Sequence, residues 1–189
     1  MTSIGKIIVM GDYGVGKTSI AKRLVGEGFT QFYNRTIGVD FKIKRFPISF
    51  RDQEIPVKWV IWDLAGDWTF NNITSDFFKG AKAGMFIYDI PRPDTLESLW
   101  LWANRLKKEF KDPIPVILVG NKRDWRGRAD TCVPKETAKQ YAQKLKDLLH
   151  ANFDIPYVET SARENENISK AFTMLIDLYK EVEGSSLSA

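Results

Sequence analysis

Residues 11–18 read G-D-Y-G-V-G-K-T and fit the pattern G-x-x-x-x-G-K-S/T in full. A run of mostly apolar, β-branched residues at 4–10 precedes this segment, and an amphipathic stretch typical of a helix, 17–27, follows it. Glycines let the backbone curl so that successive N–H groups point inward, and the helix start adds the positive end of its dipole. The pattern predicts a strand, a phosphate-binding loop and a helix. A Gly-rich turn with an incidental Lys-Thr is the alternative.

The chemistry of this loop indicates a nucleoside triphosphate without naming its base. Lys17 can place its ammonium on the β- and γ-phosphates, and the Thr18 hydroxyl can bind Mg²⁺. The residues expected to contact the phosphates are Gly14, Val15, Gly16, Lys17, Thr18 and Ser19.

Apolar strands alternate with amphipathic helices along the rest of the chain. Residues 84–88 and 116–119 are nearly uninterrupted apolar runs, typical of central strands covered on both faces. Apolar residues spaced three and four apart mark helices near 96–110, 138–149 and 168–179. This alternation predicts an α/β fold of three layers, with a mostly parallel six-stranded sheet, one antiparallel strand and helices on both faces.

One domain of residues 1–183 is expected, followed by a flexible tail at 184–189. The extended segments 41–50 and 56–62 flank the polar stretch 51–54, which indicates an antiparallel hairpin. Ligands of open parallel sheets bind at the carboxyl ends of the strands. The loops to examine therefore follow Met10, Trp62, Tyr88, Val119 and Val158.

The loop after the strand at 116–119 contains the pattern N-K-x-D. The Asp124 carboxylate can accept hydrogen bonds from the N1–H and exocyclic amine of guanine, which adenine does not offer in that geometry. The stem of Lys122 is long enough to cover the purine face, and Asn121 completes the pattern. The alternative, a solvated turn, is disfavoured because a complete phosphate loop lies in the same chain. The segment 159–163 follows the last strand and could supply a backbone N–H to the guanine carbonyl, from Ser161, Ala162 or Arg163.

Composition excludes several classes of protein. The chain has 189 residues, a net charge of +4 and one cysteine, Cys132, so no disulfide framework can form within it. No stretch approaches the about 18 apolar residues of a membrane span. His150 is the only histidine, which excludes a His-based metal cluster or a Ser-His-Asp triad. A charge excess this small does not favour nucleic-acid binding.

These motifs together resemble the Ras superfamily of small GTPases over residues 4–182. The resemblance is closest to the Rab branch, on the segments 37–41, 62–66, 77–81 and 88–90. It implies the small G-domain form of the P-loop NTPase fold, and a Mg²⁺-dependent switch that binds GTP and GDP and acts in signalling and vesicle trafficking.

The resemblance also assigns roles to residues outside the motifs. Thr36 would close on Mg²⁺ and the γ-phosphate, Asp63 would hold a Mg²⁺-bound water, and the Gly66 N–H would touch the γ-phosphate. Phe29 would lean on the guanine edge, although a core phenylalanine at a helix end remains the alternative. The implied metal ligands are Thr18, Thr36 and Asp63, and the implied catalytic residues are Lys17, Thr36, Gly66 and the residue after it.

That residue is Asp67, where the family usually has a glutamine that orients the attacking water. An aspartate is shorter, is repelled by the γ-phosphate and lacks the amide donor, so we expect hydrolysis that is slow or that uses a water positioned differently from the glutamine route. Tyr13 stands where the family has a small residue, and it either crowds the γ-phosphate or swings outward. Two other readings stay open: a module that binds GTP without hydrolysing it, and a P-loop kinase or ATPase, which N-K-x-D opposes.

The family would meet its effectors, exchange factors and GTPase-activating proteins through the switch regions 29–41 and 66–81. An aromatic triad of Phe41, Trp62 and Phe77 would meet effectors. The chain ends without the prenylated cysteines usual in Rab proteins. We therefore expect a monomer that is cytoplasmic, soluble or peripherally associated with membranes through partners.

Overall fold

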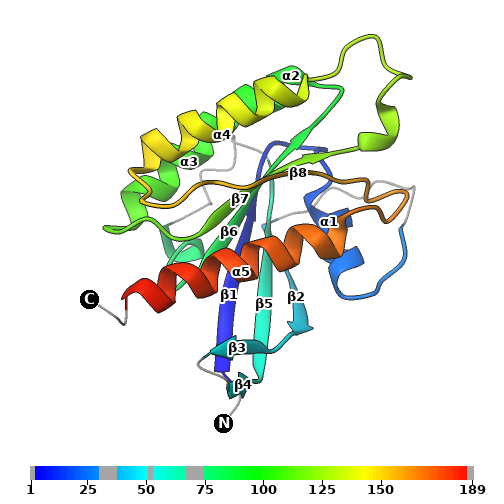
Figure 1. The fold of residues 1–189 in the computed structure, drawn as a ribbon. Helices are drawn as coiled ribbons and strands as arrows, with labels where there is room; N and C mark the ends of the chain where they lie inside the picture. Colours follow the sequence, from blue (N-terminus) through cyan, green and yellow to red (C-terminus); the bar gives the residue numbers. More distant parts are fainter. Residues whose placement is uncertain (1–2, 30–37, 51–52, 67–74, 187–189) are drawn as a thin grey trace.

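The computed structural model describes residues 3–29, 38–50, 53–66 and 75–186 (Figure 1). Its centre is a six-stranded sheet with the strand order β2-β5-β1-β6-β7-β8. Five strands are parallel, and β2 pairs antiparallel with β5, which confirms the expected sheet. The strands are β1 (Ser3–Met10), β2 (Val39–Arg45), β5 (Val57–Leu64), β6 (Ala83–Asp89), β7 (Val116–Asn121) and β8 (Tyr157–Glu159).

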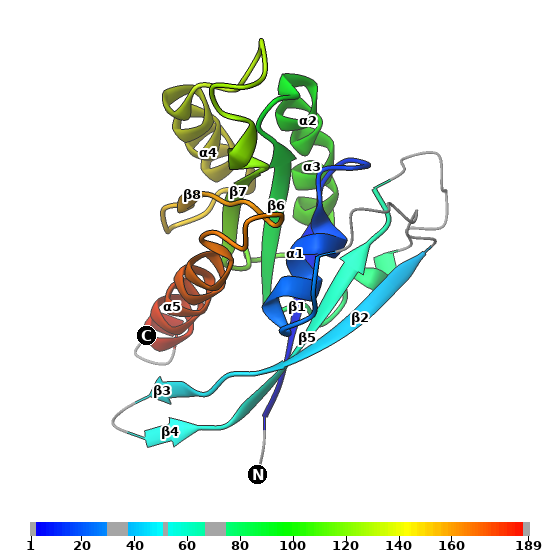
Figure 2. The same ribbon diagram turned by 90° about the vertical axis from the view of Figure 1, so that its right-hand side faces the viewer.

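The expected hairpin is present but divided. β3 (Ile48–Phe50) and β4 (Gln53–Ile55) form a separate two-stranded sheet that projects past the main sheet beside α5 (Figure 2). Two prolines, Pro47 and Pro56, lie at the junctions with β2 and β5. Because proline has no N–H to donate to the strand ladder, the expected segment 41–50 breaks at Pro47, and Pro56 separates β5 from β4, which lies largely in the stretch expected to be the turn.

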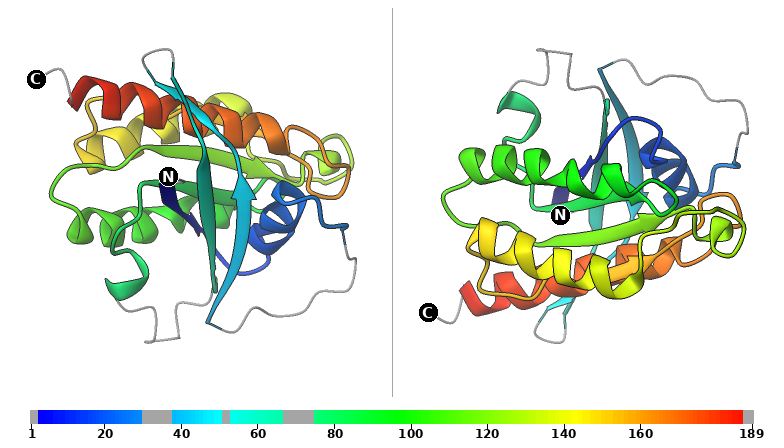
Figure 3. Two further views of the ribbon diagram at one scale, coloured as in Figure 1. Left: turned by 90° about the horizontal axis from the view of Figure 1, so that it is seen from below. Right: turned by 90° about the horizontal axis from the view of Figure 1, so that it is seen from above.

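Helices cover both faces of the sheet, as expected. One face carries α1 (Lys17–Leu24) and α5 (Ile168–Ser186). The other carries α2 (Pro93–Glu97), α3 (Leu99–Glu109) and α4 (Lys135–Leu149). Figure 3 shows α5 and α3 on opposite sides of the strands. Two single-turn 3₁₀ helices, η1 (Ser75–Phe77) and η2 (Arg123–Trp125), complete the described elements.

Alternation along β1 divides the core into two clusters. Ile7 and Val9 face α1 and α5, whereas Ile8 and Met10 face α2, α3 and α4. All four side chains are fully buried, which is the burial pattern of a central strand in a three-layer fold.

Two helix ends differ from the sequence expectation. α1 ends at Leu24 rather than near residue 27, because Gly26 adopts a left-handed conformation with φ of 85° and stops the helix. α5 continues to Ser186, so the first three residues of the expected tail belong to this helix. Within the described ranges, the helices are too short or too polar to span a bilayer.

Candidate nucleotide-binding site

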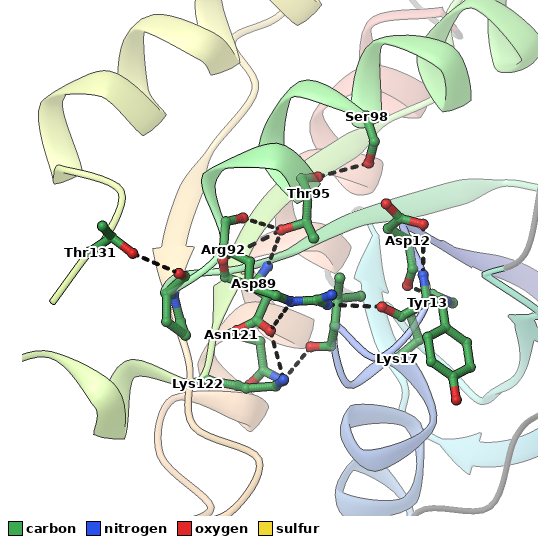
Figure 4. Close-up of polar contacts among 12 residues, drawn as sticks. Asp12, Tyr13, Lys17, Asp89, Arg92, Thr95, Ser98, Asn121, Lys122 and Thr131 are labelled. Atoms are coloured by element: carbon green, nitrogen blue, oxygen red, sulfur yellow. Dashed lines mark hydrogen bonds and ion pairs between the residues drawn. The ribbon is translucent and has the colours of Figure 1, made fainter. Parts of the chain in front are cut away.

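The loops after β1, β6, β7 and β8 meet at the carboxyl ends of the parallel strands. The loop of residues 11–16 leads from β1 into α1 and lies beside the loops that follow β6 and β7 (Figure 4). This is the edge of the sheet where ligands of such folds bind.

The phosphate loop requires glycine at positions 11 and 16, because at each one the φ angle is positive and a Cβ would collide with a neighbouring atom. Gly11 has φ of 143°, and a Cβ there would lie 2.1 Å from the Ile87 carbonyl oxygen. Gly16 has φ of 100°, and its Cβ would lie 2.2 Å from Nδ2 of Asn121. Any side chain at either position would strain the backbone and displace a neighbouring strand end or loop.

Lys17 is folded into this loop and is only 6% exposed. Its Nζ donates to the carbonyls of Gly11 and Asp12, both at 2.9 Å. Burial lowers the pKa of Lys17 to about 8, against the opposing pull of the Asp63 and Asp12 carboxylates. The ammonium is therefore held in a poorly solvated place where an anion would stabilise it.

Thr18 and Asp63 join the start of α1 to the end of β5. The Thr18 hydroxyl donates to Oδ2 of Asp63 at 2.5 Å. Burial raises the pKa of the Asp63 carboxyl, although the Thr18 hydrogen bond and the Lys17 charge oppose that shift. Oδ1 of Asp63 is buried without a hydrogen-bond partner among the described residues.

This pair of oxygen donors fits Mg²⁺, which prefers hard oxygen ligands and keeps several waters or phosphate oxygens. In the ranges that the structure describes, His, Cys, Asp and Glu side chains form no cluster of three that could hold a metal by itself. A cation held here would take its other ligands from water or from a bound phosphate.

Gly66 follows β5 and lies directly against the phosphate loop. A Cβ on Gly66 would lie 2.5 Å from Nζ of Lys17 and 2.5 Å from the backbone N of Tyr13. Glycine is therefore required here because neighbouring atoms leave no room for a Cβ, and not because the backbone is left-handed. Thr36 and Asp67, the other two residues expected to act on the γ-phosphate, lie outside the described residues.

Asn121 ties three loops together. Its Nδ2 donates to the Val15 carbonyl at 2.8 Å. Its Oδ1 accepts from the Thr160 hydroxyl and from the Ala162 N–H, both at 3.2 Å. The side chain is buried, so every one of these bonds is made away from water.

Asp124 and Ser161, expected on the base side, contact one another. The Ser161 hydroxyl donates to Oδ1 of Asp124 at 2.6 Å. The backbone of Ser161 exchanges two hydrogen bonds with Glu166, which folds the last loop back on itself. The N-K-x-D loop and the segment 159–163 thus form one wall.

Phe29 and Arg23 lie beside this wall. Nε of Arg23 donates to the Ala162 carbonyl and its Nη2 to the Arg163 carbonyl, both at 2.9 Å. The same guanidinium lies 5.9 Å from the centroid of the Phe29 ring. Phe29 is 38% exposed, so it is not a core phenylalanine.

Asp89, the last residue of β6, and Arg92, in the turn that follows, join the site without having been assigned a role from the sequence. Nε of Arg92 and Nζ of Lys122 both donate to Oδ2 of Asp89, each at 2.7 Å (Figure 4). Nη2 of Arg92 donates to the Tyr13 carbonyl at 2.8 Å. The sequence offered one indication that these residues could belong to the site, namely their position in the loop that follows Tyr88.

Tyr13 is 43% exposed, and its ring is directed away from Asp89 and Lys122 (Figure 4). Of the two arrangements that the sequence left open, this is the outward one. The backbone carbonyl of Tyr13 faces Arg92, whose Nη2 donates to it at 2.8 Å.

The expected aromatic triad forms a contact series. The rings of Phe41 and Trp62 meet edge to face with centroids 4.6 Å apart, and Phe77 lies 6.4 Å from Trp62. Phe78, by contrast, is fully buried in the core. Trp68, Phe70 and Ile73, further aromatic and apolar residues of the region 66–81, lie outside the described residues.

Comparison with known proteins gives consistent matches. The profile of the Ras family matches residues 6–181. The GTP-binding protein ypt1 of Schizosaccharomyces pombe is 33% identical over 184 residues, covering 97% of this chain and 84% of that protein. The Ras-related protein RABD2a of Arabidopsis thaliana is 32% identical over 176 residues, covering 93% and 80%. The human Ras-related protein Rab-12 is 33% identical over 172 residues, covering 91% of this chain and 65% of that longer protein.

Proposed function

The chain belongs to the Ras family as a Rab-like small GTPase, and we propose that the site described above binds and slowly hydrolyses GTP with Mg²⁺. The observation that carries the proposal is the joining of the phosphate loop to the base-reading wall through Asn121 and Val15. A nucleotide can span this site with its phosphates on Lys17 and its base on Asp124.

The proposed contacts combine the positions of the described residues with the roles that the family resemblance implies. The phosphates would lie on residues 14–19 and Gly66, and the base would lie between Lys122, Phe29 and the wall of Asp124 and residues 161–163. Thr18, Asp63 and Thr36 would hold Mg²⁺, which screens the phosphate charge. Oδ1 of Asp63, which has no hydrogen-bond partner among the described residues, and the Thr18 contact at 2.5 Å support this assignment.

We propose slow hydrolysis because of Asp67. Lys17, Thr36 and Gly66 would stabilise the γ-phosphate, whereas an ionised Asp67 would repel it and could not donate a hydrogen bond. A non-hydrolysing binding module is the second candidate, and Asp67 is the residue that favours it.

Single-turnover hydrolysis of bound GTP with Mg²⁺ tests both candidates. GDP should accumulate slowly in the wild type and faster in Asp67→Gln. Asp67→Asn removes the charge but keeps the length of the side chain. It therefore separates the effect of charge repulsion by the γ-phosphate from the effect of a side chain that is too short. GTP that stays intact in the wild type would instead support the binding module, and no gain in either variant would refute the repulsion argument.

The Rab-like branch also suggests the protein's setting. We propose that effectors, exchange factors and GTPase-activating proteins bind regions 29–41 and 66–81, with Phe41, Trp62 and Phe77 as anchors, in vesicle trafficking. The half-exposed Phe41 and its ring contact with Trp62 support the anchor role. We propose a cytoplasmic monomer that meets membranes through its partners.

A further inference from the structure

Arg92 lies at the outer edge of the phosphate loop. It comes from the turn between β6 and α2, immediately before Pro93. Its Nη2 donates to the Tyr13 carbonyl, and a Cβ built on Gly14 would lie 3.6 Å from the same nitrogen. The guanidinium therefore stands against residues 13 and 14 of the loop.

Arg92 shares its carboxylate partner with a second cation. Asp89 is buried and gives one carboxylate oxygen to both Arg92 and Lys122, while its Oδ1 has no hydrogen-bond partner among the described residues. The group formed by Asp89, Arg92 and Lys122 thus carries a net positive charge beside a phosphate-binding loop. The Arg92 side chain is still 41% exposed, so a ligand can reach it from solvent.

The contacts along the loop show which part of a nucleotide Arg92 would face. Gly66 approaches the loop at residues 12 and 13, and Asn121 binds it at Val15. Arg92 lies between these two contacts, at residues 13 and 14. If Gly66 faces the γ-phosphate and Asn121 the base side, the guanidinium faces the α- and β-phosphates between them.

We propose that Arg92 is a phosphate-binding residue, supplied from the loop after β6, which donates its remaining N–H groups to α- or β-phosphate oxygens. The inference rests on the proposed function. It adds to the phosphate site a positively charged side chain that the phosphate-loop motif does not contain. Asp89 orients the guanidinium by accepting a hydrogen bond from Nε of Arg92. The Tyr13 carbonyl, which accepts from Nη2, holds the guanidinium against the loop. GDP and GTP share these phosphates, so Arg92 acts equally on both.

The test must separate the charge of Arg92 from its hydrogen bond to the Tyr13 carbonyl. Arg92→Gln keeps an N–H donor without the charge, and Arg92→Lys keeps the charge in a smaller head group. Arg45→Gln is the matched control, because Arg45 is exposed on β2 away from the site. Equilibrium binding of GDP and of a non-hydrolysable GTP analogue is measured for each variant at low and high salt.

We expect Arg92→Gln to weaken both nucleotides by a similar factor of about ten, since one charge-assisted hydrogen bond is lost from a partly exposed site. The loss should shrink between about 0.05 M and about 0.5 M salt, because ions screen the missing charge. Arg92→Lys should recover part of the affinity, and Arg45→Gln should match the wild type.

Wild-type affinity in Arg92→Gln, or an equal and salt-independent loss in Arg92→Gln and Arg92→Lys, would overturn the inference while leaving the proposed function intact. A loss confined to the GTP analogue would also overturn it, because the contact would then lie on the γ-phosphate. Failure of the wild type to bind either nucleotide would instead refute the proposed function, and the inference with it.

Discussion

Asn121 donates a hydrogen bond from its side-chain amide to the backbone carbonyl of Val15 at 2.8 Å, which joins loops 106 residues apart in the sequence. The same amide nitrogen fills the space that a Cβ on Gly16 would need. A hydrogen bond within the protein therefore fixes the distance between the phosphate loop and the base-reading loop.

Replacing Asn121 should damage both stability and binding. Asn121→Ala leaves the Val15 carbonyl, the Thr160 hydroxyl and the Ala162 N–H without their buried partner. We expect the free energy of unfolding to fall by about 1–3 kcal/mol, with a parallel loss of GDP affinity. Urea unfolding and equilibrium binding measure the two effects, and Asn152→Ala, at an exposed asparagine, serves as the control. Tight GDP binding by Asn121→Ala would show that the two loops hold their spacing without it.

Asp124 should set the choice of base. In the proposed site its carboxylate would accept from both guanine donors, whereas an asparagine offers one acceptor and one donor. Asp124→Asn should weaken GDP binding by about tenfold to a hundredfold, and should strengthen binding of xanthosine diphosphate, which carries a carbonyl in place of the amine. Competition binding measures both, with Asp130→Asn at an exposed aspartate as the control. An unchanged preference for GDP in Asp124→Asn would contradict the assignment.

The lowered pKa of Lys17 predicts how nucleotide affinity depends on pH. Because burial lowers its pKa to about 8, part of the nucleotide-free protein lacks this charge above that pH. A bound phosphate favours the ammonium form, so GDP binding should take up a proton, and affinity should fall as pH rises past about 8. Calorimetry in two buffers of different ionisation enthalpy near pH 8.5 measures the uptake. Proton release in this range would contradict the prediction.

The same shift affects the stability of the nucleotide-free protein. Between about pH 8 and the ordinary lysine value of 10.5, the unfolded chain binds more protons at Lys17 than the folded chain does. The contribution of Lys17 to the free energy of unfolding therefore rises with pH across this window.

Phe172 should carry much of the packing between α5 and the sheet. Its ring meets Phe46 and Trp59 edge to face, with centroids 5.4 and 6.5 Å away, and its side chain is buried. Phe172→Ala should lower the free energy of unfolding by about 3–5 kcal/mol in urea. Thr173→Ala, at the neighbouring exposed position, should change it little. A small effect at Phe172 would mean that α5 is held mainly by its other contacts.

The sequence predicted most of the fold because its signals were local and periodic. The glycine spacing at 11–16 and the uninterrupted apolar runs of β6 and β7 each specify a backbone state by themselves. The break at Pro47 was signalled too, by a residue that cannot donate to a ladder, but the extended pattern of 41–50 hid it, and β4 was missed because its residues are mostly polar.

The candidate site was predictable only where a motif names its residues. Asn121, Lys122 and Asp124 follow from N-K-x-D, and their meeting with residues 11–18 follows from the order of a parallel sheet. Arg92 belongs to no motif, and its contact with Tyr13 depends on how the turn after β6 is placed by Asp89. A contact between loops that are distant in the sequence is not reflected in any local or periodic sequence pattern.

Competition between guanine and adenine nucleotides tests the central claim most directly. The purified chain with Mg²⁺ should bind GDP and a non-hydrolysable GTP analogue at or below about micromolar concentration, and a large excess of ATP should not displace them. Displacement by ATP at concentrations similar to those of GTP, or no binding of either guanine nucleotide, would contradict the account.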